Sequence, residues 1–228
     1  MIDGLAADGW QGVQLDVRVE GMRPHELGVS ARRDLASLLR RRQLMLTGLD
    51  LWLPLEAFTD PAHQHRAVER TIECIDLAAE LGRCPVSMML PADVDDASKS
   101  ILDAIVAAAA DTGVRIADFG SGVSQVSESS HAHGLGLDPA SLLASGMDPV
   151  STVHAWGSRL VAARLIDLSP QGMRIPPALG GDGRLDVMSY KVALGLSNAI
   201  DAVVVDVRQC PEPLSGLQQA RSAWESIT

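Results

Sequence analysis

Short apolar runs alternate with amphipathic segments along the whole chain. The segment Asp60–Gly82 is the clearest helix, because its apolar residues recur at spacings of three and four and Gly82 ends the pattern. Similar spacing predicts further helices over Ala31–Gln43, Asp96–Thr112, Pro139–Ser145, Pro149–Trp156, Asp186–Leu196 and Pro213–Ile227. Short apolar runs predict strands over Gly12–Val17, Leu44–Leu49, Pro85–Leu90, Val114–Ala117, Gly134–Leu137, Leu160–Ile166 and Ala202–Val207.

The regular alternation of strand and helix is typical of a parallel sheet, so the sequence predicts an α/β fold. No shift in composition and no linker divides the chain, and we expect a single domain over residues 1–228. One segment breaks the rhythm. Ser121–Ser130 contains five serines and few apolar residues, which predicts a flexible loop and a short or missing helix after the fourth run.

The charge balance narrows the possible partners. Against 29 acidic residues stand 19 basic ones, which gives a formal net charge of -10, and aromatic residues make up only 3% of the chain. Such a protein repels phosphate backbones and offers few surfaces on which bases stack, so we expect no nucleic-acid partner. No apolar run reaches the roughly 18 residues of a membrane span, so we also expect no membrane partner.

The three cysteines lie far apart and form no C-x-x-C spacing, which argues against a zinc site or a disulfide framework. We expect buried thiols in a reducing compartment. The first residues show no basic and apolar leader pattern. These features together predict a cytoplasmic protein.

Aspartates gather where the predicted strands end. Six of the seven runs finish at or beside one: Asp16, Asp50, Asp118, Asp138, Asp167 and Asp206. In a parallel sheet all six lie toward the carboxyl-end face, where α/β folds place their sites. The alternative is that some only cap the following helix, as Asp138 before Pro139 would do.

Carboxylates that lie close together need a cation among them. A divalent metal would suit their oxygen atoms. Arg164 is the other candidate, because it lies in the sixth run three residues before Asp167 and would pair with two carboxylates in place of a metal.

The chain resembles the xylose isomerase-like TIM barrels, a superfamily of sugar and sugar-phosphate isomerases and epimerases. The resemblance covers most of the sequence and rests on five segments in order: Gly12–Asp16, Leu137–Leu143, Arg164–Asp167, Gly181–Asp186 and Val203–Asp206. It implies a (β/α)8-type barrel. Met1–Asp8 matches only the end of the family's first helix, so the resemblance implies a barrel that lacks the first strand, either because the true start lies upstream or because a partner chain, a loop or rearranged strands fill the gap. An edge left open in this way favours a homo-oligomer.

The family holds one divalent metal through Glu, Asp, His and Glu at its fifth to eighth strand ends. Position by position, the resemblance implies a metal (Mn, Mg, Co or Zn) on Asp118, Asp138 and Asp206, with Arg164 where the family has His. Arginine has no lone pair to give a metal, so no metal binds if Arg164 fills the site. None of the six histidines falls at a strand's carboxyl end, and we expect His131 and His133 to lie in a solvated loop.

Two functions follow from these residues. The first is a divergent sugar or sugar-phosphate isomerase or epimerase, in which Asp118 or Asp206 is the base and Arg164 stabilises the enediolate or binds an acid group of the substrate. Asp16, Arg18, Asp50 and Asp167 would bind the sugar or polyol. The alternative is a catalytically inactive barrel that binds a small molecule or another protein.

Overall fold

The computed structural model describes residues 2–91, 96–120 and 131–227. Each predicted apolar run forms a strand, so the predicted α/β fold is confirmed. The strands are hydrogen-bonded in the order β1-β2-β3-β4-β5-β6-β9. Their bounds are β1 Gly12–Asp16, β2 Met45–Asp50, β3 Val86–Met88, β4 Ile116–Asp118, β5 His133–Leu137, β6 Leu160–Leu165 and β9 Val203–Val205. Contacts within the chain divide it into two compact units, Met1–Leu135 and Gly136–Thr228.

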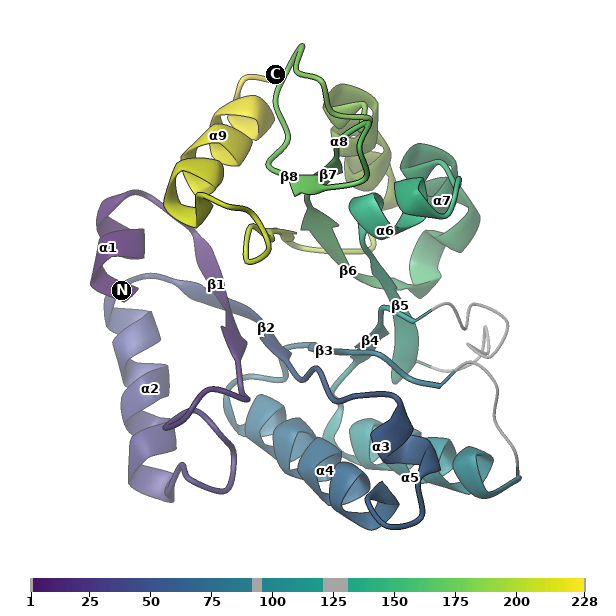
Figure 1. Ribbon diagram of the computed structural model, residues 1–228. Coiled ribbons are helices and arrows are strands. Elements are labelled where there is room, and N and C mark those ends of the chain that lie inside the picture. Colours follow the sequence, from purple (N-terminus) through teal and green to yellow (C-terminus); the bar gives the residue numbers. More distant parts are fainter. Residues whose placement is uncertain (1, 92–95, 121–130, 228) are drawn as a thin grey trace. The chain divides into compact units, whose positions relative to one another are not determined.

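Unit 1 (residues 1–135) carries strands β1 to β4 and the start of β5, each paired in parallel with the next. Figure 1 shows α4 and α5 side by side along these strands. Leu49, Ile75 and Ile116 are among the fully buried residues of its core. The helices are α1 Ile2–Ala7, α2 Val29–Arg41, α3 Glu56–Thr59, α4 Gln64–Glu80 and α5 Asp96–Thr112.

Unit 2 (residues 136–228) carries the end of β5 and the parallel pair β6 and β9. Tyr190 is fully buried in its core, donates from its hydroxyl to Arg164 O (3.0 Å) and meets the Trp224 ring edge-on. Burying a large apolar side chain contributes about 1.5–3 kcal/mol, so this core helps to stabilise unit 2. The helices are α6 Pro139–Ala144, α7 Pro149–Trp156, the 3-10 turn η2 Gly157–Arg159, α8 Val187–Ser197 and α9 Pro213–Glu225.

Unit 2 also contains a hairpin that the apolar pattern does not predict. Strands β7 Asp167–Leu168 and β8 Arg174–Ile175 pair in antiparallel fashion directly after β6. Two-residue strands are too short to show a period, so only the structure reveals them. The hairpin matters for the site because β8 carries Arg174.

The predicted burial of the cysteines is confirmed, since Cys74, Cys84 and Cys210 are all buried, with free thiols. Burial raises the pKa of the Cys84 thiol to about 12, which leaves it protonated and unreactive at neutral pH. Near the start of the chain, α1 is helical as expected, and within the described ranges no strand precedes β1. The serine-rich segment 121–130 lies outside the described residues. No described helix has the length and apolarity needed to cross a membrane.

Candidate functional site

Asp138 follows β5 and serves first as a helix cap. Its Oδ1 accepts a hydrogen bond from Ser141 N (3.0 Å), which confirms the capping alternative. A second group also binds it: Arg174 on β8 donates from Nη1 to Oδ1 (3.1 Å) and from Nη2 to Oδ2 (2.6 Å). Both oxygens of Asp138 therefore accept hydrogen bonds from the protein, and a guanidinium forks across them.

Asp206 follows β9 and binds two guanidiniums at once. Arg164 on β6 donates from Nη1 to Oδ2 (2.6 Å). Arg208 forks onto the same carboxylate from Nε to Oδ1 (2.9 Å) and from Nη2 to Oδ2 (2.8 Å). Arg164 Nη1 also lies 3.9 Å from Asp138 Oδ2, so this guanidinium pairs with two carboxylates, as the sequence predicted.

We call Asp138, Arg164, Arg174, Asp206 and Arg208 the arginine centre. Its inner side chains are enclosed and its outer ones reach the surface, since the Arg164 side chain is 6% exposed and that of Arg208 is 44% exposed. Burial raises the pKa of Asp206, but hydrogen bonds from Arg208 and the charges of Arg164, Arg208 and Arg174 outweigh burial and lower it to about 2. Asp206 is therefore an anion at every physiological pH.

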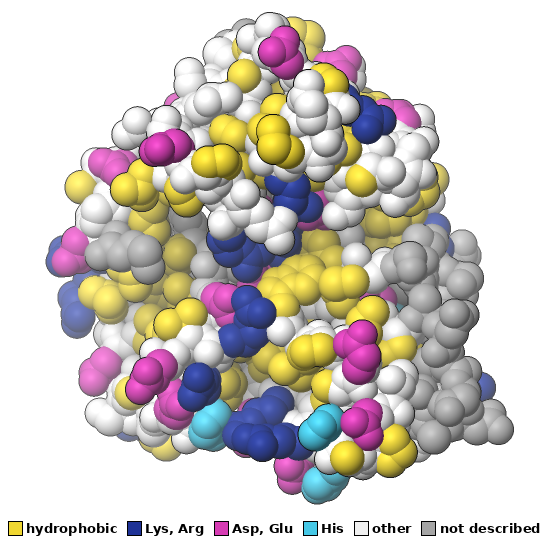
Figure 2. Space-filling view, in the orientation of Figure 1, with side chains coloured by type: hydrophobic (Ala, Val, Ile, Leu, Met, Phe, Trp, Pro, Cys, Tyr) yellow, Lys and Arg dark blue, Asp and Glu magenta, His cyan; other side chains and the backbone are white. Residues whose placement is uncertain are grey.

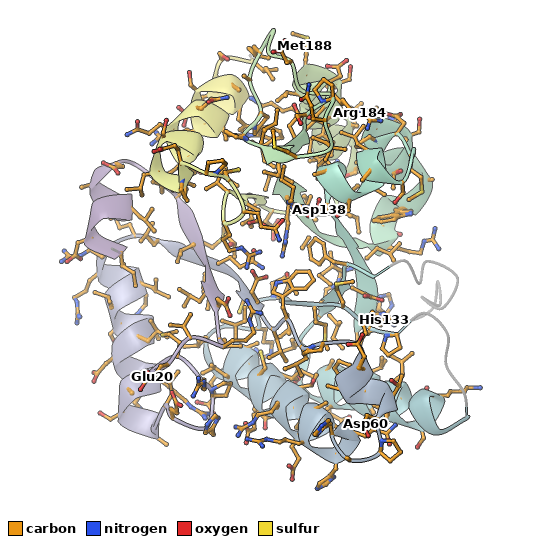
Figure 3. All side chains as sticks on the ribbon, viewed as in Figure 1. Glu20, Asp60, His133, Asp138, Arg184 and Met188 are labelled. Carbon is orange, nitrogen blue, oxygen red and sulfur yellow. The ribbon has the colours of Figure 1, made fainter. Side chains whose placement is uncertain are left out.

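Basic and acidic side chains adjoin one another on the face of unit 2 that carries the β7–β8 hairpin (Figure 2). Asp138 lies at the end of β5 on this face (Figure 3). The carboxyl ends of β5, β6 and β9 therefore supply the centre's buried members, and the two connections that follow β6 and β9 supply Arg174 and Arg208.

The arginine centre does not fit a divalent metal. A metal needs lone pairs that the protein leaves available, and the oxygens of Asp138 and Asp206 accept from guanidiniums instead. Among the described residues, no group of three or more His, Cys, Asp or Glu side chains could hold a metal ion. We therefore derive no chemical step that uses a metal.

Asp118, the other predicted ligand and base, ends β4 in unit 1. Its Oδ1 accepts from the backbone N–H of Leu90 (3.0 Å) and of Gly120 (2.8 Å), and its Oδ2 lies 3.6 Å from His133 Nε2. A side chain at Gly120 would place its Cβ 2.9 Å from Leu90 O, so this turn needs glycine. Asp118 thus ties together the connections that follow β3 and β4.

His133 corrects one sequence prediction. It opens β5 and is buried, whereas His131 is exposed as expected. The strand begins one residue before the apolar run does, and a histidine at that position is enclosed with its neighbours. The apolar pattern alone gave no sign of this burial, because a polar residue in front of a run usually marks the preceding loop.

Asp16, Arg18 and Asp50 lie at strand ends in unit 1. Arg18 forks onto Asp16 from Nε to Oδ1 (3.0 Å) and from Nη2 to Oδ2 (2.7 Å), and its Nη1 donates to Trp52 O. Gln14 Nε2 donates to Asp50 Oδ1 (2.9 Å) and to Ser87 Oγ (2.8 Å).

These strand ends also carry an aromatic pair. The Trp52 and Phe119 rings lie 5.7 Å apart, centre to centre. Gln14 and Ser87 are uncharged, so the charge pattern at the strand ends does not predict them.

Asp167 on β7, a predicted sugar-binding residue, is buried in unit 2. Its Oδ1 accepts from the backbone N–H of Leu168 (2.6 Å) and of Leu185 (2.8 Å). A Cβ at Gly183 would lie 1.7 Å from its Oδ2, so the chain passes this carboxylate at a point that only glycine allows. Burial raises the pKa of Asp167. Its contacts fix the connection that leads into α8.

Arg174 and Arg208 are members of the arginine centre that were not predicted from the sequence. Arg208 had a local signal, because an arginine two residues after a strand-end aspartate can fold back onto it, as Arg18 does. Arg174 had none, since it reaches Asp138 from a hairpin that the sequence does not reveal.

Solved structures with a similar fold cover nearly the whole chain. A xylose isomerase domain protein from Planctomyces limnophilus is 13% identical with a TM-score of 0.73, over 97% of this chain and 88% of that one. The IOLI protein with a bound zinc atom is 18% identical with a TM-score of 0.75, over 98% and 90%. D-psicose 3-epimerase in the presence of D-fructose is 14% identical with a TM-score of 0.71, over 99% and 90%.

No protein-family model matches the sequence, and no curated protein sequence does either. The structural matches show that the chain has the TIM-barrel fold of the xylose isomerase-like proteins. At these identities they show the fold alone, and the function has to be argued from the site.

Proposed function

We propose that this chain is a divergent barrel of the xylose isomerase-like type that binds an anionic sugar, a sugar phosphate or sugar acid, at its arginine centre. One observation carries the proposal: Asp206 holds two guanidiniums at once, one buried and one half-exposed. A guanidinium fork matches a carboxylate or a phosphate with two parallel hydrogen bonds. The acid group of a ligand can therefore take the place that Asp206 now occupies on Arg208.

The exchange keeps the buried charges paired. When Arg208 turns from Asp206 to the ligand, Arg164 still donates to Asp206 Oδ2, so no carboxylate is left alone in the interior. Arg174 stays on Asp138 and adds a second positive charge near the same face. The ligand gains a bidentate contact in exchange for the partly solvated Arg208–Asp206 pair.

The sugar part of the proposal has separate support. Solved structures of similar fold include epimerases with D-fructose and with D-tagatose. Unit 1, taken by itself, also carries a polar group of the kind that binds hydroxyls, formed by Asp50, Gln14 and Ser87, and the ring faces of Trp52 and Phe119. Within unit 1 alone, Asp50 and the Asp16–Arg18 pair remain the predicted sugar-binding residues, and we assign Asp167 of unit 2 to positioning.

Isomerase or epimerase activity would need a base as well as this binding. A base works best when its pKa lies near the operating pH, and Asp206 has a pKa of about 2. Asp118 is the other predicted base, and its Oδ1 accepts two backbone hydrogen bonds. Binding is therefore the function that the site supports best, and turnover is an outcome of the test below.

The test compares one sugar in three forms: the neutral aldose, its phosphate ester and its aldonic acid. Thermal unfolding is followed with each, in the wild-type chain, in Arg208→Gln and in the control Arg221→Gln, which removes a surface pair on α9. At a concentration 100 times the dissociation constant, binding adds about 2.7 kcal/mol, a rise of roughly 5–10 °C. We expect the phosphate ester and the aldonic acid to raise the unfolding temperature, and the neutral aldose not to. The rise should persist in Arg221→Gln and be lost in Arg208→Gln.

An equal shift with the neutral sugar, or a shift that survives in Arg208→Gln, would contradict the proposal. The same samples report turnover, because an isomerase or epimerase would convert a bound sugar into its isomer over hours. A chelator followed by excess Mn²⁺, Mg²⁺, Co²⁺ or Zn²⁺ completes the series. We expect none of these metals to raise the unfolding temperature. A rise with a metal in the wild-type chain that was lost in Asp138→Asn would instead support a metal-dependent isomerase or epimerase.

A further inference from the structure

The two carboxylates of the arginine centre differ in what each keeps when its outer guanidinium leaves. Asp206 keeps Arg164, whose Nη1 donates to its Oδ2 at 2.6 Å. Asp138 would keep a much longer contact, since Arg164 Nη1 lies 3.9 Å from its Oδ2. A buried carboxylate without a close cation is costly. Arg174 therefore stays on Asp138, and Arg208 is the fork that a ligand can take.

The exchangeable fork holds a carboxylate in the free protein. Arg208 donates from Nε and Nη2 to the two oxygens of Asp206, at 2.9 Å and 2.8 Å. A carboxylate on the ligand can take over the same two hydrogen bonds in the same planar geometry. A phosphate group brings a third oxygen, and the guanidinium of Arg174 already directs both of its Nη atoms to Asp138. The fork is thus filled by two ligand oxygens.

The charges of the centre favour a ligand with a single negative charge. Three guanidiniums and two carboxylates give the arginine centre a net charge of +1. Cys210 and Tyr190 adjoin it and stay neutral, because burial raises the pKa of the thiol and of the hydroxyl. A ligand carboxylate brings the net charge to zero. A phosphate monoester carries about 1.5 to 2 negative charges at pH 7 and leaves an unpaired excess in a largely enclosed site.

The surroundings of the centre do not offset that excess. On β7, next to β8, the charge of Arg184 acts on Asp167, so these two groups balance each other. Glu212, in the connection that also carries Arg208, is exposed and adds a negative charge. His154 on α7 is exposed as well and is the one histidine in residues 136–228. The chain as a whole has a net charge of -10, which repels a dianion more than a monoanion.

We infer that the ligand of the arginine centre is a sugar acid, which binds Arg208 through a carboxylate group. This inference rests on the proposed function and narrows it to one of the two acid classes. A phosphate ester binds at the same fork but less tightly, and it binds best with one proton on its phosphate group. That proton is lost near pH 6, so the affinity for the ester depends on pH.

The test compares D-glucuronate with D-glucose 6-phosphate, which carry the acid group on the same carbon of the same sugar. Calorimetry at about pH 7.5 should show glucuronate binding at least about fivefold more tightly, because the phosphate is then mostly a dianion. Between about pH 7.5 and pH 5.5 the affinity for the phosphate ester should rise on the order of tenfold. The affinity for glucuronate should stay constant, since its carboxylate is ionised throughout, as is Asp206 with a pKa of about 2.

Asp138→Asn tests the charge argument in the same assay. Asparagine can still cap α6, but the centre gains one positive charge and Arg174 is released from its fork. The affinity for the phosphate ester relative to glucuronate should then rise by about tenfold or more at pH 7.5. Asp148→Asn is the matched control, because both aspartates begin an Asp-Pro-x-Ser sequence and cap a helix, but Asp148 is exposed and outside the centre.

The outcomes separate this inference from the proposed function. Acids that bind through Arg208, with the phosphate ester as tight as glucuronate at about pH 7.5 or unaffected by pH, would overturn the choice of a carboxylate and leave the proposed function standing. The same ratio in Asp138→Asn and Asp148→Asn would also overturn it. If neither acid binds, or both still bind in Arg208→Gln, the proposed function fails together with the inference.

Discussion

The tripeptide Asp-Val-Arg begins at the last residue of the first strand of the sheet and again directly after the last strand, and the two copies can be compared directly. At both positions the arginine folds back onto the aspartate two residues earlier. Its Nε lies 3.0 Å from Oδ1 of Asp16 and 2.9 Å from Oδ1 of Asp206, and its Nη2 lies 2.7 Å and 2.8 Å from the respective Oδ2 atoms. The local geometry is thus the same.

The surroundings of the two forks differ. Asp16 is partly exposed, whereas Asp206 is buried and also accepts from Arg164. A solvated ion pair contributes about 0–1 kcal/mol, whereas a buried pair broken on one side costs several times more. The tripeptide itself therefore determines the geometry of the fork. A residue from another strand, Arg164 in the case of Asp206, determines whether the fork is a surface ion pair or part of a buried charge cluster.

Removing the buried arginine should give the largest effect. Arg164→Met leaves Asp206 with a half-exposed partner and takes a positive charge from beside Asp138, so we expect a loss of about 3–5 kcal/mol in the free energy of unfolding. Arg18→Met is the matched change at the first fork and should cost less than about 1 kcal/mol. Urea denaturation measures both. Similar costs would show that the two forks are equivalent after all.

Lowering the pH should destabilise the protein through Asp206 more than through Asp16, by less than the loss of Arg164 does. The pKa of Asp206 in the folded protein is about 2, below its ordinary value of 3.8, so its contribution is present above about pH 4 and lost as the pH falls toward 2. The shift corresponds to about 2 kcal/mol. Unfolding measured between pH 5 and pH 2 should show this loss in Asp16→Asn but not in Asp206→Asn. An acid dependence that both variants keep would assign it to other carboxylates.

The smallest effect should come from replacing a fork by a single charge. Arg208→Lys keeps the positive charge but loses the two parallel hydrogen bonds, and Arg18→Lys makes the same change at the first fork. Each should cost less than about 1 kcal/mol of stability, because both arginines are exposed. The affinity for an anionic sugar, measured by calorimetry, should fall in Arg208→Lys. An affinity that stayed the same in Arg208→Lys would contradict the role of its fork in binding the acid group.

Much of the fold could be predicted from the sequence. Apolar periodicity located each strand of the main sheet, and it gave the bounds of Asp96–Thr112 and Pro149–Trp156 as the structure has them. The preference for aspartate at helix starts also predicted that Asp138 could cap the following helix, and its Oδ1 does accept from Ser141 N. These features depend on neighbours in the sequence. That the chain forms a single domain stays a prediction.

The site was less predictable because its contacts join distant parts of the chain. Arg164 was found, since a charged residue inside an apolar strand stands out. Arg174 was not, because a two-residue strand leaves no pattern and its partner Asp138 is far away in the sequence. The position at a strand end also did not distinguish the two carboxylates. Asp167 accepts hydrogen bonds from backbone N–H groups, whereas Asp206 accepts them from arginine side chains. The role of each aspartate depends on how many groups donate to it and on which part of the chain they come from.

The carboxylate of Asp118 has a consequence for motion. One of its oxygens accepts from two amides, those of Leu90 and Gly120, which belong to connections after different strands. Neither amide can exchange its hydrogen with solvent until that oxygen releases it, so the two should gain deuterium at correlated rates. Connections that are separate along the chain would then open as a single kinetic unit.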